Sequence, residues 1–179
     1  MDADFATDYF ELFGLPRRFV IDSARLAAAY RELQSQVHPD RFAAASDAER
    51  RRSMQWATFA NEAYRTLRDP LARARYLVNL HGVETAEETN TAMPPEFLMQ
   101  QMEWREAVAD ARSSRDEAEL VALAEQLAGE RGQLIDELET ALDAAQDYTA
   151  AATLVRKLRF LEKLAEEIGD ANAALADAS

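Results

Sequence analysis

The sequence predicts an all-α protein in which a helical hairpin with flanking helices is followed by a three-helix bundle. Two observations predict this class. The 179 residues include only 5 Gly and 5 Pro, and the residues that favour helices, Ala, Leu, Glu and Arg, dominate. Apolar residues also recur at helical spacing, and strong start and stop signals separate the segments.

The first two predicted helices lie before residue 38. A short helix carries Phe10 and Phe13 on its inner side and ends at Gly14, which is followed by Pro16. Asp22 caps the second helix, which ends near Val37 because Pro39 disfavours helical backbone in the residue before it. Its apolar stripe is Leu26, Tyr30, Leu33 and Val37.

The third and fourth predicted helices begin at recognisable caps. Residues 46–49, Ser-Asp-Ala-Glu, match a capping box, and Asp69-Pro70 places a cap before a proline that suits the first helical position. The fourth helix ends at His81-Gly82. The inner face expected for the third helix is Ala57, Ala60, Tyr64 and Leu67.

Polar residues 83–94 predict a linker between domains at 1–82 and 95–179. A fifth helix runs from Pro95 to about Arg112, a capping box at 114–117 starts the sixth, and Asp147 caps the seventh, which is expected to fray after Gly169. The sixth helix has the stripe Leu120, Leu123, Leu127, Leu134, Leu138 and Leu142. The seventh has the stripe Ala151, Val155, Leu158, Leu161, Ala165 and Ile168.

Charge and composition exclude several classes of function. The net charge of −13 disfavours nucleic acid. Residues 1–82 hold 12 basic and 11 acidic side chains, whereas 83–179 hold 8 and 22, which suggests two surfaces for different partners. With no Cys and only His38 and His81, we expect no metal site and no cofactor. The absence of a long apolar run and of a signal peptide predicts a cytoplasmic protein without a membrane span.

The tripeptide His38-Pro39-Asp40 lies between the second and third predicted helices. A plain Pro-Asp turn is the simplest interpretation, but Tyr30 stands eight residues upstream, Arg41-Phe42 follows, and residues 61–67 read Asn-Glu-Ala-Tyr-Arg-Thr-Leu. With residues 8–15, this pattern resembles a J-domain, whose defining signature is that tripeptide.

The resemblance implies a domain that stimulates ATP hydrolysis by a DnaK-class chaperone. An exposed Asp40 could bind an Arg of the partner, and Arg31 would add attraction for an acidic surface. Ala27 and Glu32 stand where J-domains commonly carry a basic residue. The expected chaperone-binding residues are His38, Pro39, Asp40, Arg31, Tyr30 and Arg41.

The second half is similar to the HscB family, through residues 69–77, 80–82, 97–103 and 155–161, and the resemblance spans Asp8 to about Ile168. It implies a non-enzymatic co-chaperone that binds an IscU-like iron–sulfur scaffold protein and delivers it to an HscA-like chaperone. We expect the chain to be a monomer. The expected scaffold-binding residues are Leu98, Met99, Met102, Glu103, Glu106 and Phe160. A J-domain adaptor for another client, or an enzyme using carboxylates, are the alternatives.

Helical geometry gives independent support for a contact surface on the fifth helix. At 100° per residue, Phe97, Trp104 and Val108 share one side, which suits a core. Leu98 and Met102 fall on another arc, so the helix is apolar on more than one face. The alternative interpretation is that these side chains also pack inside the bundle.

Overall fold

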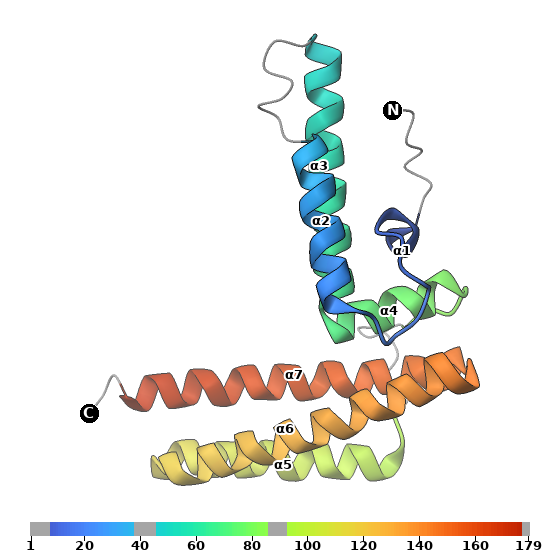
Figure 1. Cartoon of the computed structure of the whole chain (residues 1–179). Coiled ribbons are helices and arrows are strands. Elements are labelled where there is room, and N and C mark those ends of the chain that lie inside the picture. The colour runs from blue at the N-terminus through green and yellow to red at the C-terminus, as the bar shows by residue number, and fades with distance from the viewer. Residues whose placement is uncertain (1–7, 38–45, 86–92, 177–179) are drawn as a thin grey trace. The chain divides into compact units, whose positions relative to one another are not determined.

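The computed structural model describes residues 8–37, 46–85 and 93–176, and every regular element in these ranges is helical. The chain divides into two compact units, Met1–Leu80 and His81–Ser179. Unit 1 contains α1 to α4, and unit 2 contains α5 to α7 (Figure 1). The all-helical prediction is therefore confirmed for the described residues. None of the helices there is long and apolar enough to cross a membrane.

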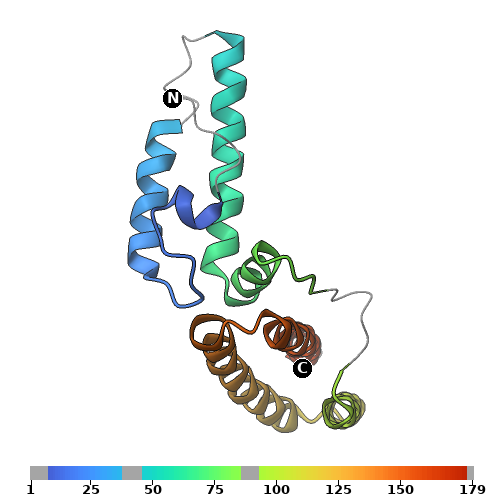
Figure 2. The same cartoon turned by 90° about the vertical axis from the view of Figure 1, so that its right-hand side faces the viewer.

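Unit 1 is built on a hairpin of two long helices. In it, α2 (Ser23–Val37) and α3 (Asp47–Arg68) lie side by side and antiparallel, and both Figure 1 and Figure 2 show this pair. The short α1 (Tyr9–Leu12) packs against α3. The fourth helix, α4 (Pro70–Leu80), follows α3 in the chain after Asp69 and packs against it. Their core is formed by Phe10, Phe13, Leu15, Phe19, Leu26, Val37, Trp56, Ala60, Ala63, Leu67, Leu71, Ala74, Leu77 and Val78.

The caps predicted for unit 1 are confirmed. The Asp22 carboxylate accepts a hydrogen bond from the Arg25 backbone at the start of α2. Ser46 and Glu49 form the capping box of α3. Gly14 has φ +60°, which an L side chain rarely adopts and which lets the chain turn sharply after α1. Local signals therefore place the ends of these helices.

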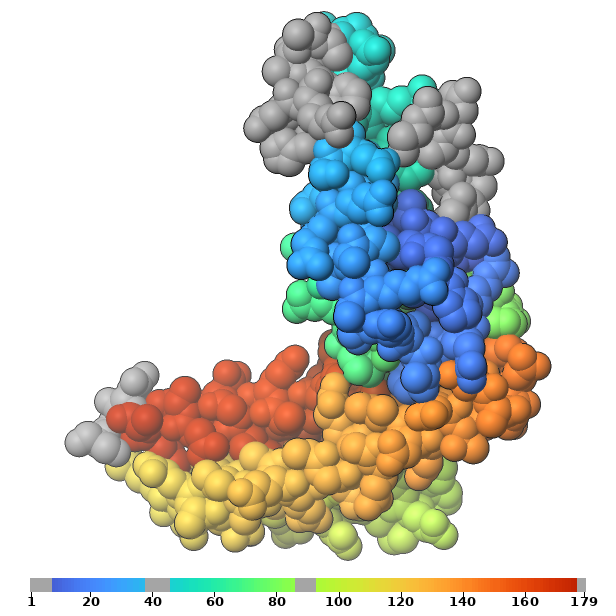
Figure 3. All heavy atoms as spheres, in the orientation of Figure 1, coloured from blue at the N-terminus to red at the C-terminus, as the bar shows by residue number. Residues whose placement is uncertain are grey.

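Unit 2 is a bundle of α5 (Pro95–Ser114), α6 (Glu117–Glu139) and α7 (Tyr148–Ala176), with a π-helical turn, η2 (Thr140–Ala145), extending α6. All six leucines predicted for the inner stripe of α6 and η2 are buried. They pack against α7 and α5, and Figure 2 looks along the axes of these helices. Figure 3 shows both α6 and α7 on the near face of this bundle, and α2 beside the residues that precede it on the near face of unit 1.

Three details of unit 2 correct the sequence predictions. Ser114 ends α5 and does not cap α6, because Arg115 adopts left-handed backbone with φ 57° and Asp116 is the cap. Ala165 is exposed, since Leu164 takes its place in the core between Leu161 and Ile168. The segment after Gly169 continues the helix to Ala176, and its Ala171 is buried.

The start of the predicted linker belongs to unit 2. Thr85 is buried, and its carbonyl oxygen accepts a hydrogen bond from Arg156 Nη1 of α7 at 3.1 Å. The His81 ring stacks on Tyr148 at a centroid separation of 3.8 Å. The rest of that linker prediction, residues 86–92, lies outside the described residues.

Candidate functional site

The signature tripeptide, His38, Pro39 and Asp40, and the neighbouring Arg41 lie outside the described residues. The structure describes instead what holds the chain immediately before them. The Ser53 hydroxyl of α3 donates a buried hydrogen bond to the Val37 carbonyl oxygen at 2.6 Å. Because Val37 is the last residue of α2, this bond fixes the level along α3 at which α2 ends.

The chain after the signature is held by the capping box of α3. The Ser46 backbone N–H and hydroxyl donate to the Glu49 carboxylate at 2.9 and 2.7 Å. The hydrogen bond from the hydroxyl is the larger cause, and that from the backbone N–H the smaller, of a pKa of Glu49 below its usual value. Contacts with α3 therefore fix Val37 and Ser46, the described residues on either side of the signature segment.

Tyr30, predicted to bind the chaperone, joins α2 to α3. Its hydroxyl donates to Asn61 Oδ1 at 2.6 Å and accepts a hydrogen bond from Gln34 Nε2 at 2.9 Å. Its ring stacks on Tyr64 at 4.1 Å with an interplanar angle of 13° and meets the Phe13 ring edge-on at 6.5 Å. These contacts show that Tyr30 sets the packing of the hairpin, whatever else it binds.

Arg31, the next residue on α2, is exposed. Neither a side-chain hydrogen bond nor an ion pair joins it to another described residue. Its charge therefore lies on the surface of unit 1, and its binding to a chaperone stays a prediction. Arg31 and Tyr30 are the members of the predicted chaperone-binding set that the structure describes.

In unit 2, α5 presents apolar side chains on two sides. Phe97 and Trp104 face the core. Leu98, Met99 and Met102 are 41%, 59% and 72% exposed. The interpretation that these three pack inside the bundle is therefore wrong. Together with the exposed carboxylates Glu103 and Glu106, we call them the α5 patch.

Phe160, the sixth residue of the predicted scaffold-binding set, has a different environment. It is half-buried on α7, with its ring 5.8 Å from Phe97 and 6.3 Å from Trp104. The Arg105 guanidinium lies over the ring at 5.4 Å. Phe160 thus closes the contact between α5 and α7 and offers only part of its ring to a partner.

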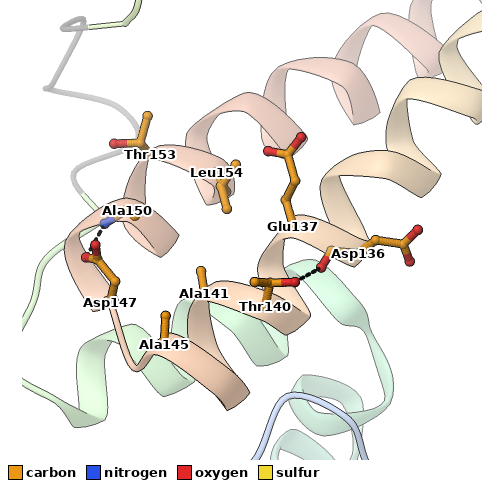
Figure 4. A pocket seen from close by; sticks show the side chains of 9 residues that line it. All are labelled: Asp136, Glu137, Thr140, Ala141, Ala145, Asp147, Ala150, Thr153 and Leu154. Atoms are coloured by element: carbon orange, nitrogen blue, oxygen red, sulfur yellow. Dashed lines mark hydrogen bonds between the residues drawn. The ribbon is translucent and has the colours of Figure 1, made fainter.

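A hollow of about 660 Å³ opens where η2 leads into α7 (Figure 4). Two of its polar side chains make local hydrogen bonds: the Thr140 hydroxyl donates to the Asp136 carbonyl, and Asp147 caps α7 through the Ala150 N–H. Among the described residues, no three His, Cys, Asp or Glu side chains gather as they would around a metal ion. The walls of the hollow are Asp136, Glu137, Thr140, Ala141, Ala145, Asp147, Ala150, Thr153 and Leu154.

Sequence reasoning missed Ser53 and the role of Asn61. The sequence around a serine in an amphipathic helix does not show which carbonyl its hydroxyl will bind, because the acceptor belongs to another helix. Asn61 had a signal, since the Asn-Glu-Ala-Tyr run was part of the J-domain pattern. Its hydrogen bond to Tyr30 becomes visible only once α2 and α3 are paired.

Comparison with known proteins agrees with this arrangement in both units. The family model described as the HSCB C-terminal oligomerisation domain matches residues 93–169. A co-chaperone protein HscB homolog of Aromatoleum aromaticum is 53% identical over 175 residues, covering 98% of this chain and 99% of the relative. The corresponding protein of Azoarcus sp. is 56% identical with the same coverage.

Solved structures show the same similarity in three dimensions. Chaperone HscB from Vibrio cholerae is 40% identical with a TM-score of 0.83, covering 94% of this chain and 99% of that one. Human co-chaperone protein HscB is 34% identical with a TM-score of 0.88, covering 93% of this chain and 83% of the human one. The likeness therefore extends over nearly the whole chain.

Proposed function

We propose that this chain, which belongs to the HscB family of co-chaperones, stimulates ATP hydrolysis by a DnaK-class, HscA-like chaperone and delivers an IscU-like iron–sulfur scaffold protein to it. In this proposal, unit 1 binds the chaperone through His38, Pro39, Asp40, Arg41, Arg31 and Tyr30. Unit 2 binds the scaffold through the α5 patch and Phe160. The chain itself performs no chemistry and holds no cofactor.

The observation that carries the proposal is the exposure of Leu98, Met99 and Met102 on a helix that already buries another face. Apolar side chains gathered on a surface favour a protein contact, and flexible methionines adapt to a partner. Glu103 and Glu106 border them, so basic groups on the scaffold would be attracted to the same place. Phe160 would add one edge of its ring.

The chaperone arm of the proposal rests on Asp40 and its supports. A carboxylate such as that of Asp40 can form a charge-assisted hydrogen bond to an Arg of the partner. Ser53 and the capping box fix Val37 and Ser46, the described residues on either side of 38–45. We propose a cytoplasmic location for this activity, as expected from the sequence.

The chain is proposed to act as a monomer, with the α5 patch reserved for the scaffold. Self-association through the same patch is the competing occupant, and the description of the matching family model names oligomerisation. Sedimentation of the purified chain alone and with scaffold distinguishes the two. A stable dimer that dissociates when Met102 is changed to Asp would contradict the monomer.

The direct test of the proposed function is single-turnover ATP hydrolysis by a purified DnaK-class chaperone with this chain added. We expect Asp40→Asn to abolish stimulation, because it removes the charge and keeps the shape. Asp47→Asn, which removes a nearby exposed carboxylate in the first turn of α3, should leave stimulation within about twofold, as expected for an exposed charge. Normal stimulation by Asp40→Asn with an unchanged circular dichroism spectrum would show that Asp40 has another role.

A further inference from the structure

We infer that residues 1–7 dock on an exposed face of α3, where the Phe5 ring fills a hollow in the surface of unit 1. The two acidic residues of the segment, Asp2 and Asp4, then lie toward Arg51. Residues 1–7 themselves are outside the described ranges. The docking needs neither chaperone nor scaffold, so it stands apart from the proposed function.

The hollow has a volume of about 510 Å³ and lies along one face of α3. Its described walls are Met54, Gln55, Thr58, Phe59 and Glu62, which follow the spacing of residues that share a side of a helix. We call it the α3 hollow. Met54, at one end, is 60% exposed, and Phe59 is half-buried. These two apolar walls suit an apolar side chain.

The described chain begins beside the α3 hollow. The ring of Tyr9, the first residue of α1, meets the Phe59 ring edge-on at 5.5 Å. Burial raises the pKa of the Tyr9 hydroxyl, and the charge of the nearby Glu62 carboxylate raises it further. Tyr9 is preceded by Asp8, which caps α1. The segment 1–7 is therefore joined to the chain next to the Phe59 and Glu62 walls.

The length of the segment matches the length of the hollow. From Phe59 back to Arg51, α3 spans about 12 Å at 1.5 Å per residue. An extended chain covers about 3.3 Å per residue, so Phe5, three residues before the described chain, reaches about 10 Å and Asp4 about 13 Å. Phe5 can therefore reach the level of Met54, and Asp4 the level of Arg51.

Arg51 gives the acidic end of the segment a partner of opposite charge. It stands three residues before Met54 on α3, so it continues the face that lines the hollow. Its side chain is exposed, and neither an ion pair nor a side-chain hydrogen bond joins it to another described residue. The segment carries Asp2 and Asp4 and no Lys or Arg. Attraction between these charges favours a segment that runs toward the start of α3.

A segment of the same chain fits the α3 hollow better than a separate protein does. Because it is tethered at the edge of the hollow, its effective concentration there is roughly millimolar. Only residues 4–7 have to be ordered for the Phe5 ring to bind, and one aromatic ring offers a large apolar surface for that cost. A second copy of the chain would need a much larger buried area than a single hollow supplies.

The test measures oxidation of Met54 by dilute hydrogen peroxide in the full-length protein, followed by mass spectrometry of its peptides. We expect Phe5→Ala to speed this oxidation about threefold or more, because the sulfur is then no longer covered by the docked segment. Phe5→Leu should keep most of the protection, since an apolar side chain of similar size still fills the hollow. Met102, which is 72% exposed on α5, is the internal control and should react at the same rate in every variant.

A second pair of variants tests the charges. Asp2→Asn/Asp4→Asn should also speed oxidation of Met54, though less than Phe5→Ala, because it removes only the attraction to Arg51. Added salt should have the same effect on the wild type and little on this variant. Asp170→Asn, which removes an exposed carboxylate from α7, is the matched control and should leave the rate unchanged.

Nuclear Overhauser contacts between the Phe5 ring and the methyl groups of Met54 and Thr58 give a direct second measurement, and we expect them in the full-length wild type. Either their absence or an unchanged rate of Met54 oxidation in Phe5→Ala would overturn the docking. Protection of Met54 that disappears on dilution would assign the α3 hollow to a second copy of the chain and overturn it too. Phe5→Ala should stimulate the chaperone like the wild type, so a failure of the proposed function leaves these results unaffected.

Discussion

The buried hydroxyl of Ser53 has a larger structural role than its size suggests. The last carbonyls of a helix have no partner within that helix, and Ser53 satisfies the one at Val37 from the neighbouring helix. A buried carbonyl left without a donor costs about 1–3 kcal/mol. This single bond therefore helps to set where α2 stops and where the signature residues begin.

We predict that Ser53→Ala lowers the free energy of unfolding of unit 1 by about 1–2 kcal/mol. Thr58→Ala is the matched control, because the Thr58 hydroxyl is also on α3 and donates to a carbonyl, that of Met54, but is exposed and within its own helix. The control should change stability by less than about 0.5 kcal/mol. Urea unfolding followed by circular dichroism measures both, and equal effects of the two changes would contradict the role given to Ser53.

At the same scale, sequence pattern predicted roles for isolated residues unevenly. The helical spacing correctly placed Leu26 and Val37 in the core, because large apolar side chains are buried when they lie on the inner face of a helix. For Ala165, the spacings i+3 and i+4 from Leu161 both suited a core stripe. The larger Leu164 gained more from burial, so it occupies the core and Ala165 is exposed.

Among the elements, α5 shows how a helix can serve two surfaces. Its buried face, Phe97, Trp104, Val108 and Ala111, packs in the bundle. Its exposed arc contains Leu98, Met99 and Met102. The two-sided character was predictable from the sequence, because both faces follow from the 100° repeat. Which face is buried follows from the aromatic contacts of Phe97 and Trp104 with α7.

We predict that Met99→Ala/Met102→Ala weakens binding to a purified IscU-like scaffold about a hundredfold and leaves the melting temperature unchanged. Burial of each methionine at an interface contributes roughly 1.5 kcal/mol or more, and about 1.4 kcal/mol corresponds to tenfold in affinity. Val121→Ala, at a valine of α6 that is 50% exposed, is the control and should bind normally. Calorimetry and thermal melting on the same samples give both quantities, and normal affinity of the double variant would remove the α5 patch from the interface.

Phe160→Ala should behave differently from the methionine changes. Because its ring packs on Phe97 and Trp104, we expect a loss of roughly 2–4 kcal/mol in stability, somewhat below the cost for a fully buried Phe. Phe160→Leu should restore most of the stability by refilling the space. If Phe160→Ala melts like the wild type, the ring is a surface group and its part in scaffold binding can be measured directly.

The junctions between elements were harder to predict than the elements. Asp147 was identified as a cap because its residue type marks the start of a helix. The preceding π-helical turn at 140–145 was not predicted, because no residue type in it marks a wider turn. The residue that follows it, Gln146, has left-handed backbone with φ 54°. The Ser114 prediction was wrong for a related reason, since Arg115 and not a glycine takes the left-handed position after α5.

At the scale of the whole molecule, charge and structure divide the chain in nearly the same place. Residues 1–82 are close to neutral and 83–179 carry the net negative charge. The boundary in the sequence between the two compact units falls between Leu80 and His81. His81 and Thr85 contact α7 through Tyr148 and Arg156. A boundary drawn from sequence at Gly82 cuts through these contacts, because a helix stop signal marks the end of a helix and not the end of a packed unit.

The division into units predicts that residues 1–80 fold alone and retain weak stimulation of the chaperone without binding the scaffold. Each unit has its own buried core, and a domain with its own core can fold alone.

The complementary fragment 81–179 should bind the scaffold through the α5 patch without stimulating hydrolysis, and it keeps the contacts of His81 and Thr85. Circular dichroism melting of each fragment, calorimetry with scaffold and the hydrolysis assay measure these outcomes. A fragment 1–80 that is unfolded alone but folds when 81–179 is added would show that the two units depend on each other, and scaffold binding by 1–80 would show that recognition is not confined to unit 2.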